Sequence, residues 1–333
     1  MSAPLVSVII PTYQRPELLP RAVESALTYQ GPDVEVVVVP NGPDNSWKHS
    51  LWRWTSDARV RVSPISTAHG NVARNQGMAL ATGKYIRFLD DDDYLLEDSR
   101  QQLTRLEGES AEVCSGLVQS VDRDGSSLGQ LTFPSTRDFV CATVDALYGT
   151  GFTQPTGLIF LRSSIANCRW DPMVERTQDY AWMMDISAAA ERRWVHVPVP
   201  VGAWVQHPAK RVSSNGPIRR KEQPFVKRLL ALYDQLTAEN RMSFQRTQAI
   251  ARALWRYAHR GFPYHPFYWS KVAQRARLMD MASIPPDSLY QRIPLRLLNP
   301  IIGEWLLLPP RRLTRALRDV RSIISEEPYK RRL

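Results

Sequence analysis

Residues 84–93 decide the fold and have the sequence Lys84-Tyr85-Ile86-Arg87-Phe88-Leu89-Asp90-Asp91-Asp92-Asp93. The apolar residues Ile86, Phe88 and Leu89 predict a buried strand. The four carboxylates that follow repel one another, so they cannot be buried without compensating partners. Oxygen ligands in such a compact array suit a hard divalent cation, Mg²⁺ or Mn²⁺, which in turn binds phosphate oxygens. The stretch therefore predicts a metal site at the end of a strand. The alternatives are a solvated acidic turn, or a cap for a helix that begins near Glu97.

Strand-like and helix-like segments alternate before this stretch. Residues 6–10 and 34–39 are continuous β-branched runs, which are typical of buried parallel strands. Residues 59–62 predict a third strand, and residues 17–29 and 69–81 have the apolar spacing of helices. This alternation indicates a doubly wound α/β sheet, in which ligands bind at the carboxyl ends of the strands.

The rest of the chain is predicted to extend this sheet and then to become helical. Two strands, a helix and a further strand are expected at residues 113–121, 157–161, 178–191 and 195–205. From about residue 222 onward the pattern is helical and is interrupted by prolines. We therefore expect a catalytic or binding domain over residues 1–218 and a helical extension over residues 219–333.

The charge of the chain divides between the same two regions. The net charge is +10, but residues 1–218 carry 20 Lys and Arg against 24 Asp and Glu, a net of −4. Residues 219–333 carry 23 against 9, a net of +14. This asymmetry indicates different partners, and the basic region favours phosphate in nucleic acid or in an anionic lipid surface.

The composition favours a cytoplasmic protein. Three widely spaced cysteines, Cys114, Cys141 and Cys168, indicate neither a disulfide framework nor a zinc site, so buried free thiols are expected. The sequence from Met1 has no signal-peptide pattern, and no apolar run approaches the roughly 20 residues of a membrane span. We expect the protein in the cytoplasm, either free or peripheral on the inner face of the cytoplasmic membrane.

Four segments together resemble the family 2 glycosyltransferases, which have the GT-A fold. They are Val6-Ser7-Val8-Ile9-Ile10-Pro11-Thr12-Tyr13-Gln14-Arg15, Val72-Ala73-Arg74-Asn75-Gln76-Gly77, residues 83–93, and Thr177-Gln178-Asp179. The resemblance covers roughly residues 5–215. It implies a GT-A-like mixed sheet and an inverting, hexosyltransferase-type enzyme that uses a nucleotide-diphospho-sugar, most often a UDP-sugar, with Mn²⁺ or Mg²⁺. The implied acceptor is a hydroxyl of a glycan or of a polyprenyl-linked molecule, in bacterial surface-polysaccharide or glycoconjugate synthesis.

The resemblance places the donor nucleotide at the ends of the first two strands. The residues expected to bind it after the first strand are Pro11, Thr12, Tyr13 and Arg15. The Tyr13 ring can stack on a base, with ordinary turn packing as the alternative, and the Asn41 amide can hydrogen-bond a pyrimidine ring. The family typically carries an Asp pair where this chain has Pro40-Asn41.

The acidic run corresponds to the family's metal-binding motif. The resemblance implies that Asp90 and Asp91 contact the donor, with Asp91 at the ribose, and that Asp92 ligates the metal. Asp93 is expected to support these ligands or to cap a helix. Arg74 lies in the preceding helix, where its planar guanidinium can pair with a carboxylate and with the donor diphosphate.

Asp179 is the expected catalytic base. It occupies the second position of the family's Glu-Asp pair, with Gln178 in place of the Glu. An inverting transfer needs one base to deprotonate the acceptor hydroxyl. The alternative is that Asp179 caps the helix that carries Trp182.

The resemblance also implies residues around the diphosphate and the acceptor. His207, which precedes a Ser-containing loop, is the second expected metal ligand, and Lys210 and Arg211 are expected to contact the diphosphate. Trp182 is expected to stack on an acceptor sugar, and Thr156 to border the same pocket.

Residues 311–324 predict a basic amphipathic helix. Its apolar stripe consists of Leu313, Leu317, Val320 and Ile324. Its basic stripe consists of Arg311, Arg315 and Arg318. Residues 301–308 are apolar but too short to cross a bilayer. Peripheral contact with an anionic membrane explains this region, and a helical bundle with solvated arginines is the alternative.

Two other functions remain open for the whole chain. Pro40 and Gln178 depart from the family pattern, which leaves a catalytically silent scaffold of the same fold as one alternative. The basic C-terminal region leaves a nucleic-acid-binding protein as the other. No zinc-finger spacing, RNA-binding motif or helix-turn-helix pattern is evident, so nucleic acid is not an expected partner.

Overall fold

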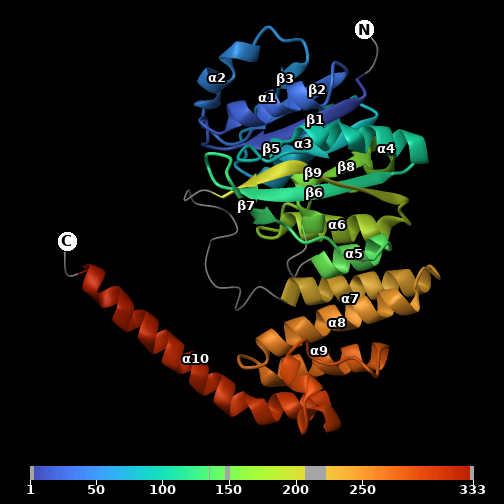
Figure 1. Cartoon of the computed structure of the whole chain (residues 1–333), viewed down its shortest axis with the longest axis vertical. Helices are drawn as coiled ribbons and strands as arrows, with labels where there is room; N and C mark the ends of the chain where they lie inside the picture. Colours follow the sequence, from blue (N-terminus) through green and yellow to red (C-terminus); the bar gives the residue numbers. More distant parts are fainter. Residues whose placement is uncertain (1–3, 135, 147–150, 207–222, 331–333) are drawn as a thin grey trace. The chain divides into compact units, whose positions relative to one another are not determined.

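The chain forms two compact units, residues 1–215 and 216–333 (Figure 1). The computed structural model describes residues 4–134, 136–146, 151–206 and 223–330. The predicted domain boundary after residue 218 lies outside these described residues.

The first unit is built on a nine-stranded mixed sheet with the order β3-β2-β1-β4-β8-β6-β9-β5, and β7 pairs with β6. The strands are β1 Val6–Thr12, β2 Val34–Pro40, β3 Val60–Val62, β4 Tyr85–Phe88, β5 Tyr94–Leu95, β6 Val113–Val121, β7 Ser127–Gln130, β8 Leu158–Leu161 and β9 Trp194–Val205. Strands β1 to β4 pair in parallel, whereas β8 is antiparallel to both β4 and β6. The predicted mixed α/β sheet is therefore confirmed.

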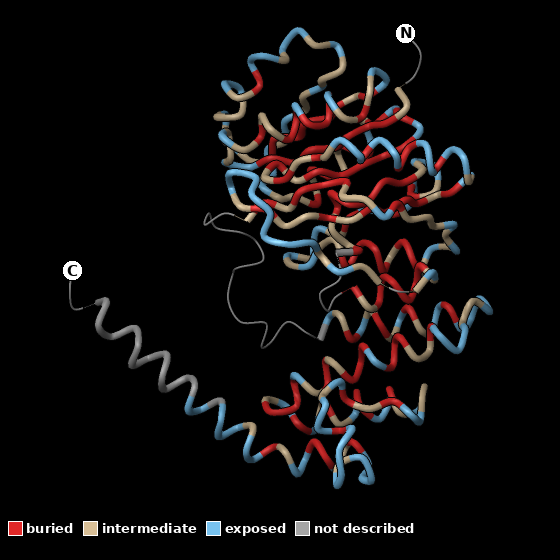
Figure 2. Tube along the Cα trace, in the orientation of Figure 1, coloured by how far each residue is buried: buried red, intermediate tan, exposed pale blue. Residues whose placement is uncertain are grey.

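Strand β1 shows how both faces of the sheet are covered. Its residues Val6, Val8 and Ile10 belong to a core that includes residues of α1 and α4. Ile9 lies on the other face, where a Cβ atom on Gly77 of α3 would come within 2.3 Å of its side chain. Gly77 therefore permits α3 to approach β1 closely, and both faces of β1 are buried, as Figure 2 shows for the strands in general.

Three helices of this unit begin and end near the positions predicted at residues 17–29, 69–81 and 178–191, and two further helices were not predicted. The helices of the unit are α1 Leu19–Tyr29, α2 Trp47–Ser50, α3 Gly70–Leu80, α4 Gln101–Glu109, α5 Phe139–Ala146 and α6 Gln178–Ala189. Helix α3 begins after His69, whose imidazole Nδ1 accepts a hydrogen bond from the Asn71 amide at 3.1 Å. The predicted segment near Glu97 is a short 3₁₀ turn that leads into α4.

Strand β9 confirms the predicted extended segment in spite of its prolines. It pairs in parallel with β6, and the register shifts twice where β9 contains Pro198 and Pro200. Proline has no N–H to donate, so the ladder is interrupted at this point and resumes toward Val205. The end of β9 therefore still reaches the edge of the sheet where β4 ends.

The second unit consists of helices. They are α7 Gln223–Ala238, α8 Phe244–Gly261, α9 Pro266–Met279 and α10 Pro300–Lys330. The predicted amphipathic segment is part of α10, which begins at Pro300, before the predicted start at residue 311. The Asn299 side-chain oxygen accepts a hydrogen bond from the Ile301 backbone amide at this helix start. Among the described residues, no helix combines the length and the apolar character that crossing a bilayer requires. The three cysteines are buried and free, as predicted.

Candidate active site

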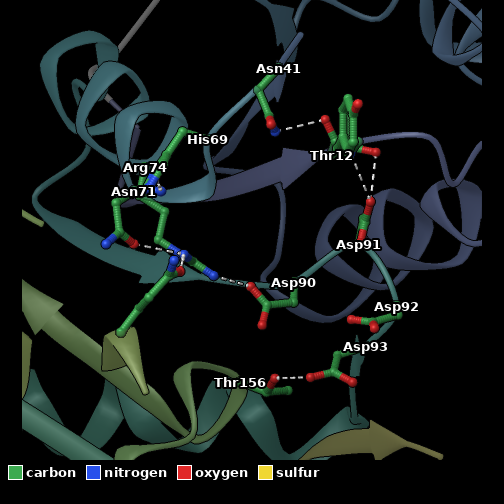
Figure 3. A network of polar contacts seen from close by, with 12 residues as sticks. Thr12, Asn41, His69, Asn71, Arg74, Asp90, Asp91, Asp92, Asp93 and Thr156 are labelled. Atoms are coloured by element: carbon green, nitrogen blue, oxygen red, sulfur yellow. Dashed lines mark hydrogen bonds and ion pairs between the residues drawn. The ribbon is translucent and has the colours of Figure 1, made fainter. Parts of the chain in front are cut away.

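The parallel strands β1 and β4 end side by side and bring the loop after β1 onto the acidic run. Thr12 Oγ1 donates a hydrogen bond to Asp91 Oδ2 at 2.7 Å (Figure 3). Arg15 Nη1 lies 3.1 Å from Asp91 Oδ1 and 2.7 Å from Asp92 Oδ2. Arg15 therefore offsets part of the repulsion between neighbouring carboxylates.

Asp91 is buried, which does not fit the predicted contact with a ribose. Its two oxygens accept hydrogen bonds from Thr12, from Arg15 and from the Tyr13 amide. Burial raises the pKa of Asp91 to about 7, although the Arg15 charge acts in the opposite direction. The side chain thus fixes the loop after β1.

The other three carboxylates of the run form a compact set of oxygens. Asp90, Asp92 and Asp93 each offer an oxygen atom within 4.8 Å of the others. Asp93 is buried, and it accepts hydrogen bonds from Thr156 Oγ1 at 2.9 Å and from the Val205 amide at 3.0 Å. Burial, with the charges of Asp92 and Asp90, raises the pKa of Asp93 well above its ordinary value. A hard divalent cation fits this all-oxygen set, because it would relieve that repulsion.

Arg74 on α3 connects the acidic run to the start of α6. Its Nη2 forms an ion pair with Asp90 Oδ1 at 2.7 Å, and its Nη1 donates to Gln178 Oε1 at 3.0 Å (Figure 3). Asn71 Oδ1 accepts a further hydrogen bond from Nη1 at 3.2 Å, and the guanidinium lies 4.6 Å from the centre of the Trp170 ring. Arg74 is buried, so its guanidinium is not free in solvent but holds the Asp90 carboxylate in position.

Asp179 lies in the first turn of α6, next to Gln178. Thr177 is the N-cap residue, so the alternative in which Asp179 caps this helix is wrong. Burial raises the pKa of Asp179 to about 6; the Arg74 charge opposes this shift, and the Asp90 charge adds to it. A carboxylate with this pKa is mostly ionised at neutral pH and still accepts a proton readily.

A small cleft borders the acidic run at the ends of β1 and β2. Its lining residues are Thr12, Gln14, Arg15, Pro16, Pro40, Asn41, Asp44, Ser46 and Trp47. The Asn41 amide nitrogen donates to the Thr12 carbonyl at 2.9 Å, so recognition of a ligand by this amide would use its oxygen (Figure 3). Trp47 was not identified from the sequence, because a lone Trp after a polar loop carries no motif.

Tyr13 lies beside this cleft and is partly exposed. A Cβ atom on Gly42 would come within 2.8 Å of the Tyr13 ring, and the Gly42 φ angle is +91°. Both observations show that the Tyr13 ring rests on a position that only glycine occupies without strain. An aromatic surface held in this way is available for stacking.

The structure corrects both predicted acceptor contacts. Trp182 is 3% exposed and stacks on Trp170 with ring centres 4.4 Å apart. Its indole Nε1 donates to the Cys168 carbonyl at 2.9 Å, so it is a core residue that no sugar can contact. Thr156 is fully buried and is bonded to Asp93, so it supports the acidic run instead.

Several predicted site residues cannot be placed. His207, Lys210 and Arg211 lie outside the described residues. Pro11 is described, but it is a buried residue of β1.

One buried cation beneath the acidic run was not recognised from the sequence. Arg87 of β4 is fully buried and donates to the Thr156 and Ser99 carbonyls and to Gln102 Oε1. Burial lowers the pKa of Arg87 to about 10. The sequence pattern does not predict its burial, since only the tertiary structure supplies these acceptors.

A wider hollow lies between α4 and the first half of β9, with His196 and Val197 on its wall. The last residue of β9, Val205, is the one that contacts Asp93. The hollow is therefore at the other end of this strand, away from the converging charged groups. We assign the candidate site to the acidic run.

Comparison with known proteins agrees with this assignment. Residues 7–168 match the family described as glycosyl transferase family 2. The chain is 37% identical over 127 residues to the uncharacterized glycosyltransferase EpsJ of Bacillus subtilis, which covers 36% of each protein. It is 28% identical over 221 residues to the succinoglycan biosynthesis protein ExoO of Rhizobium meliloti, which covers 61% of each. The matches thus span between about a third and three fifths of the length of these relatives.

The fold is similar to that of S. aureus TarS. A crystal structure of TarS residues 1–349 in complex with UDP-GlcNAc superposes with a TM-score of 0.64 at 16% identity, over 82% of this chain and 81% of that one. The first unit therefore has the GT-A fold. Residues 7–168, which include the acidic run, therefore form a glycosyl transferase family 2 domain.

Proposed function

We propose that the protein is an inverting, metal-dependent glycosyltransferase that moves a sugar from a UDP-sugar to an acceptor hydroxyl. The observation that carries the proposal is the convergence of the Asp90, Asp92 and Asp93 carboxylates with Asp179 across Arg74. Related proteins named for succinoglycan and amylovoran synthesis support a bacterial polysaccharide or a lipid-linked glycan as the acceptor class.

The chemistry assigned to this chain's residues needs one base. Asp179 accepts the proton of the acceptor hydroxyl while that oxygen forms a bond to the anomeric carbon from the side opposite the diphosphate. The bond between the anomeric carbon and the diphosphate oxygen breaks, and its electron pair leaves with the nucleoside diphosphate. The configuration of the anomeric carbon inverts because this carbon undergoes a single displacement, in which the diphosphate is the leaving group.

The acidic run would hold the cation that the family requires. Asp92 and Asp90 are the ligands we assign, and Asp93 orients them through its bonds to Thr156 and to the Val205 amide. When bound, Mn²⁺ or Mg²⁺ supplies neutralisation of the diphosphate charge.

The cleft beside Tyr13 is where we propose that the base binds. Uracil has an imide N–H that donates a hydrogen bond, and the Asn41 amide oxygen is an acceptor of the right kind. Tyr13 supplies a stacking surface. The structural relative TarS has been crystallised with UDP and with UDP-GlcNAc, which supports uridine for this chain as well.

A thermal-shift screen with UDP, GDP, TDP and CMP, each with and without Mn²⁺, tests the donor site. A ligand that binds only the folded state raises its stability by mass action, by about 2.7 kcal/mol at a hundred times its Kd. We expect the largest increase with UDP in the presence of Mn²⁺. Equal shifts with all four nucleotides would contradict uridine recognition.

Hydrolysis of a UDP-sugar then tests catalysis without a known acceptor, because water can replace the hydroxyl. Binding of UDP without any hydrolysis or transfer across a panel of UDP-sugars would favour the catalytically silent scaffold.

A further inference from the structure

Among its described side chains, helix α10 packs on the rest of the second unit mainly through the side that carries Glu304. Glu304 is fully buried and accepts hydrogen bonds from Tyr290 Oη, at 2.8 Å, and from Arg311 Nη1; its other neighbour is His259. Leu308 is buried on the same side. At helical spacing these residues share one face, which α10 therefore uses to pack on its own unit.

Arg311 differs from its predicted role as part of a basic stripe that faces a membrane. It is paired with Glu304 and also donates to the His259 carbonyl. Arg311 is therefore an internal anchor of α10.

The opposite side of α10 is apolar and exposed. Positions 302, 306, 313 and 317 follow one another at helical spacing, and their side chains Ile302, Leu306, Leu313 and Leu317 are 53–63% exposed. Figure 2 shows that buried residues occur near the start of α10 and that exposed residues predominate farther along it. An exposed apolar stripe of this length is unusual for a protein in water and marks a binding surface.

The segment before α10 adds to this surface. Its exposed apolar side chains are Leu289, Ile293, Leu297 and Leu298, and Trp305 and Phe267 pack edge to face with ring centres 5.2 Å apart. An indole at the edge of an apolar surface is typical of a membrane interface.

The charges of this surface select its partner. Between residues 288 and 317 the sequence contains one carboxylate, Glu304, and that carboxylate is buried. The acidic residue next to this stretch, Asp287, lies 3.6 Å from His259. Arg292, Arg296 and Arg312 are exposed. The surface of this stretch is therefore apolar and positive, without an acidic side chain to repel an anionic partner.

We propose that the second unit binds an anionic lipid bilayer through α10 and the segment from Leu289, with α10 lying in the plane of the interface. No described helix is suited to crossing the bilayer, so the apolar stripe inserts only to headgroup depth. A second copy of the chain is a poorer occupant, because pairing two such surfaces brings the same arginines together.

Co-sedimentation of the full chain with vesicles tests this surface. We expect binding to vesicles that contain phosphatidylglycerol, little binding to pure phosphatidylcholine vesicles, and loss of binding at high salt. The double variant Leu313→Ser/Leu317→Ser removes part of the apolar stripe and should weaken binding by about tenfold or more. The variant Arg292→Glu/Arg296→Glu should weaken it by a similar factor of about ten or more, through charge reversal.

Matched controls come from the first unit. Leu128→Ser/Met173→Ser removes two exposed apolar side chains elsewhere, and Arg53→Glu/Arg193→Glu makes the same change in net charge. Both controls should bind vesicles as the original chain does. Equal loss in a variant and its control would overturn the assignment of the surface.

Three other outcomes would also overturn it. One is the absence of binding to phosphatidylglycerol vesicles at low salt. Another is an oligomer, measured by light scattering without vesicles, that Leu313→Ser/Leu317→Ser dissociates. A third is binding to RNA that is as strong as binding to phosphatidylglycerol vesicles and that Leu313→Ser/Leu317→Ser leaves unchanged. This would show a general affinity for polyanions.

Discussion

Arg74 and Asp90 form an ion pair, with Nη2 2.7 Å from Oδ1, that connects helix α3 to the end of strand β4. The same guanidinium reaches Gln178 at the start of α6. Gln178 stands where the family has a Glu, and here its amide oxygen is a neutral acceptor for Arg74. The pair therefore couples the proposed metal-binding run to the segment that carries the proposed base.

Arg74→Lys should destabilise the fold by about 1–3 kcal/mol, because one ammonium group cannot bond Asp90, Asn71 and Gln178 together and leaves buried polar atoms unpaired. Urea denaturation measures this change. Arg105→Lys is the control, since Arg105 forms an exposed pair with Glu109 and such pairs contribute little. Equal stability of the two variants would show that the Arg74 contacts carry no energy.

Asp179→Asn should reduce transfer or hydrolysis of the UDP-sugar by a factor of about 10²–10⁴, since an amide cannot take the proton of the attacking hydroxyl. Nucleotide affinity, measured by calorimetry, should stay the same because Asp179 lies outside the cleft beside Tyr13. Turnover at the original rate would remove Asp179 from the mechanism.

The pH dependence of kcat/KM should report the same carboxylate. Because the pKa of Asp179 is raised to about 6, the proposed base should be protonated and inactive below that pH and ionised above it. Activity should therefore fall as the pH is lowered through about 6, with a slope near tenfold per pH unit. A fall that is centred near pH 4 instead would indicate a carboxyl group with an ordinary pKa.

Asp92→Ala should abolish the part of the thermal stabilisation by UDP that depends on Mn²⁺, because it removes one of the oxygens of the acidic run. Asp124→Ala, at an exposed turn, is the matched control and should retain it. A full Mn²⁺ effect in Asp92→Ala would mean that the acidic run is a structural turn.

Trp182→Ala should lower the free energy of unfolding by about 3–5 kcal/mol, because it leaves a cavity beside Trp170, Phe88 and Phe160. The midpoint of denaturant unfolding measures the loss. An increase in acceptor KM at unchanged stability would restore the original prediction that Trp182 contacts the acceptor.

The sequence by itself determined the order of the longer strands and of helices α1, α3 and α6, and the position of the acidic run. Both are local properties: β-branched runs such as residues 34–39 predict buried strands, and helical spacing predicts segments such as α1. The placement of the acidic run after a buried strand also follows from local sequence. The candidate site residues were assigned by matching sequence segments to the family's motifs in their order along the chain, and this matching requires no knowledge of packing.

Only the tertiary structure decided which polar groups face one another and which side chains are buried. Trp182 belongs to the core because Trp170, which lies outside α6, stacks on it. Asp91 is enclosed by Thr12 and Arg15, and Arg311 turns inward because Glu304 is buried beside it. Except for Glu304 and Arg311, which share α10, such partners lie on different elements, and the cost of burying an unpaired charge is offset only when folding brings the partners together.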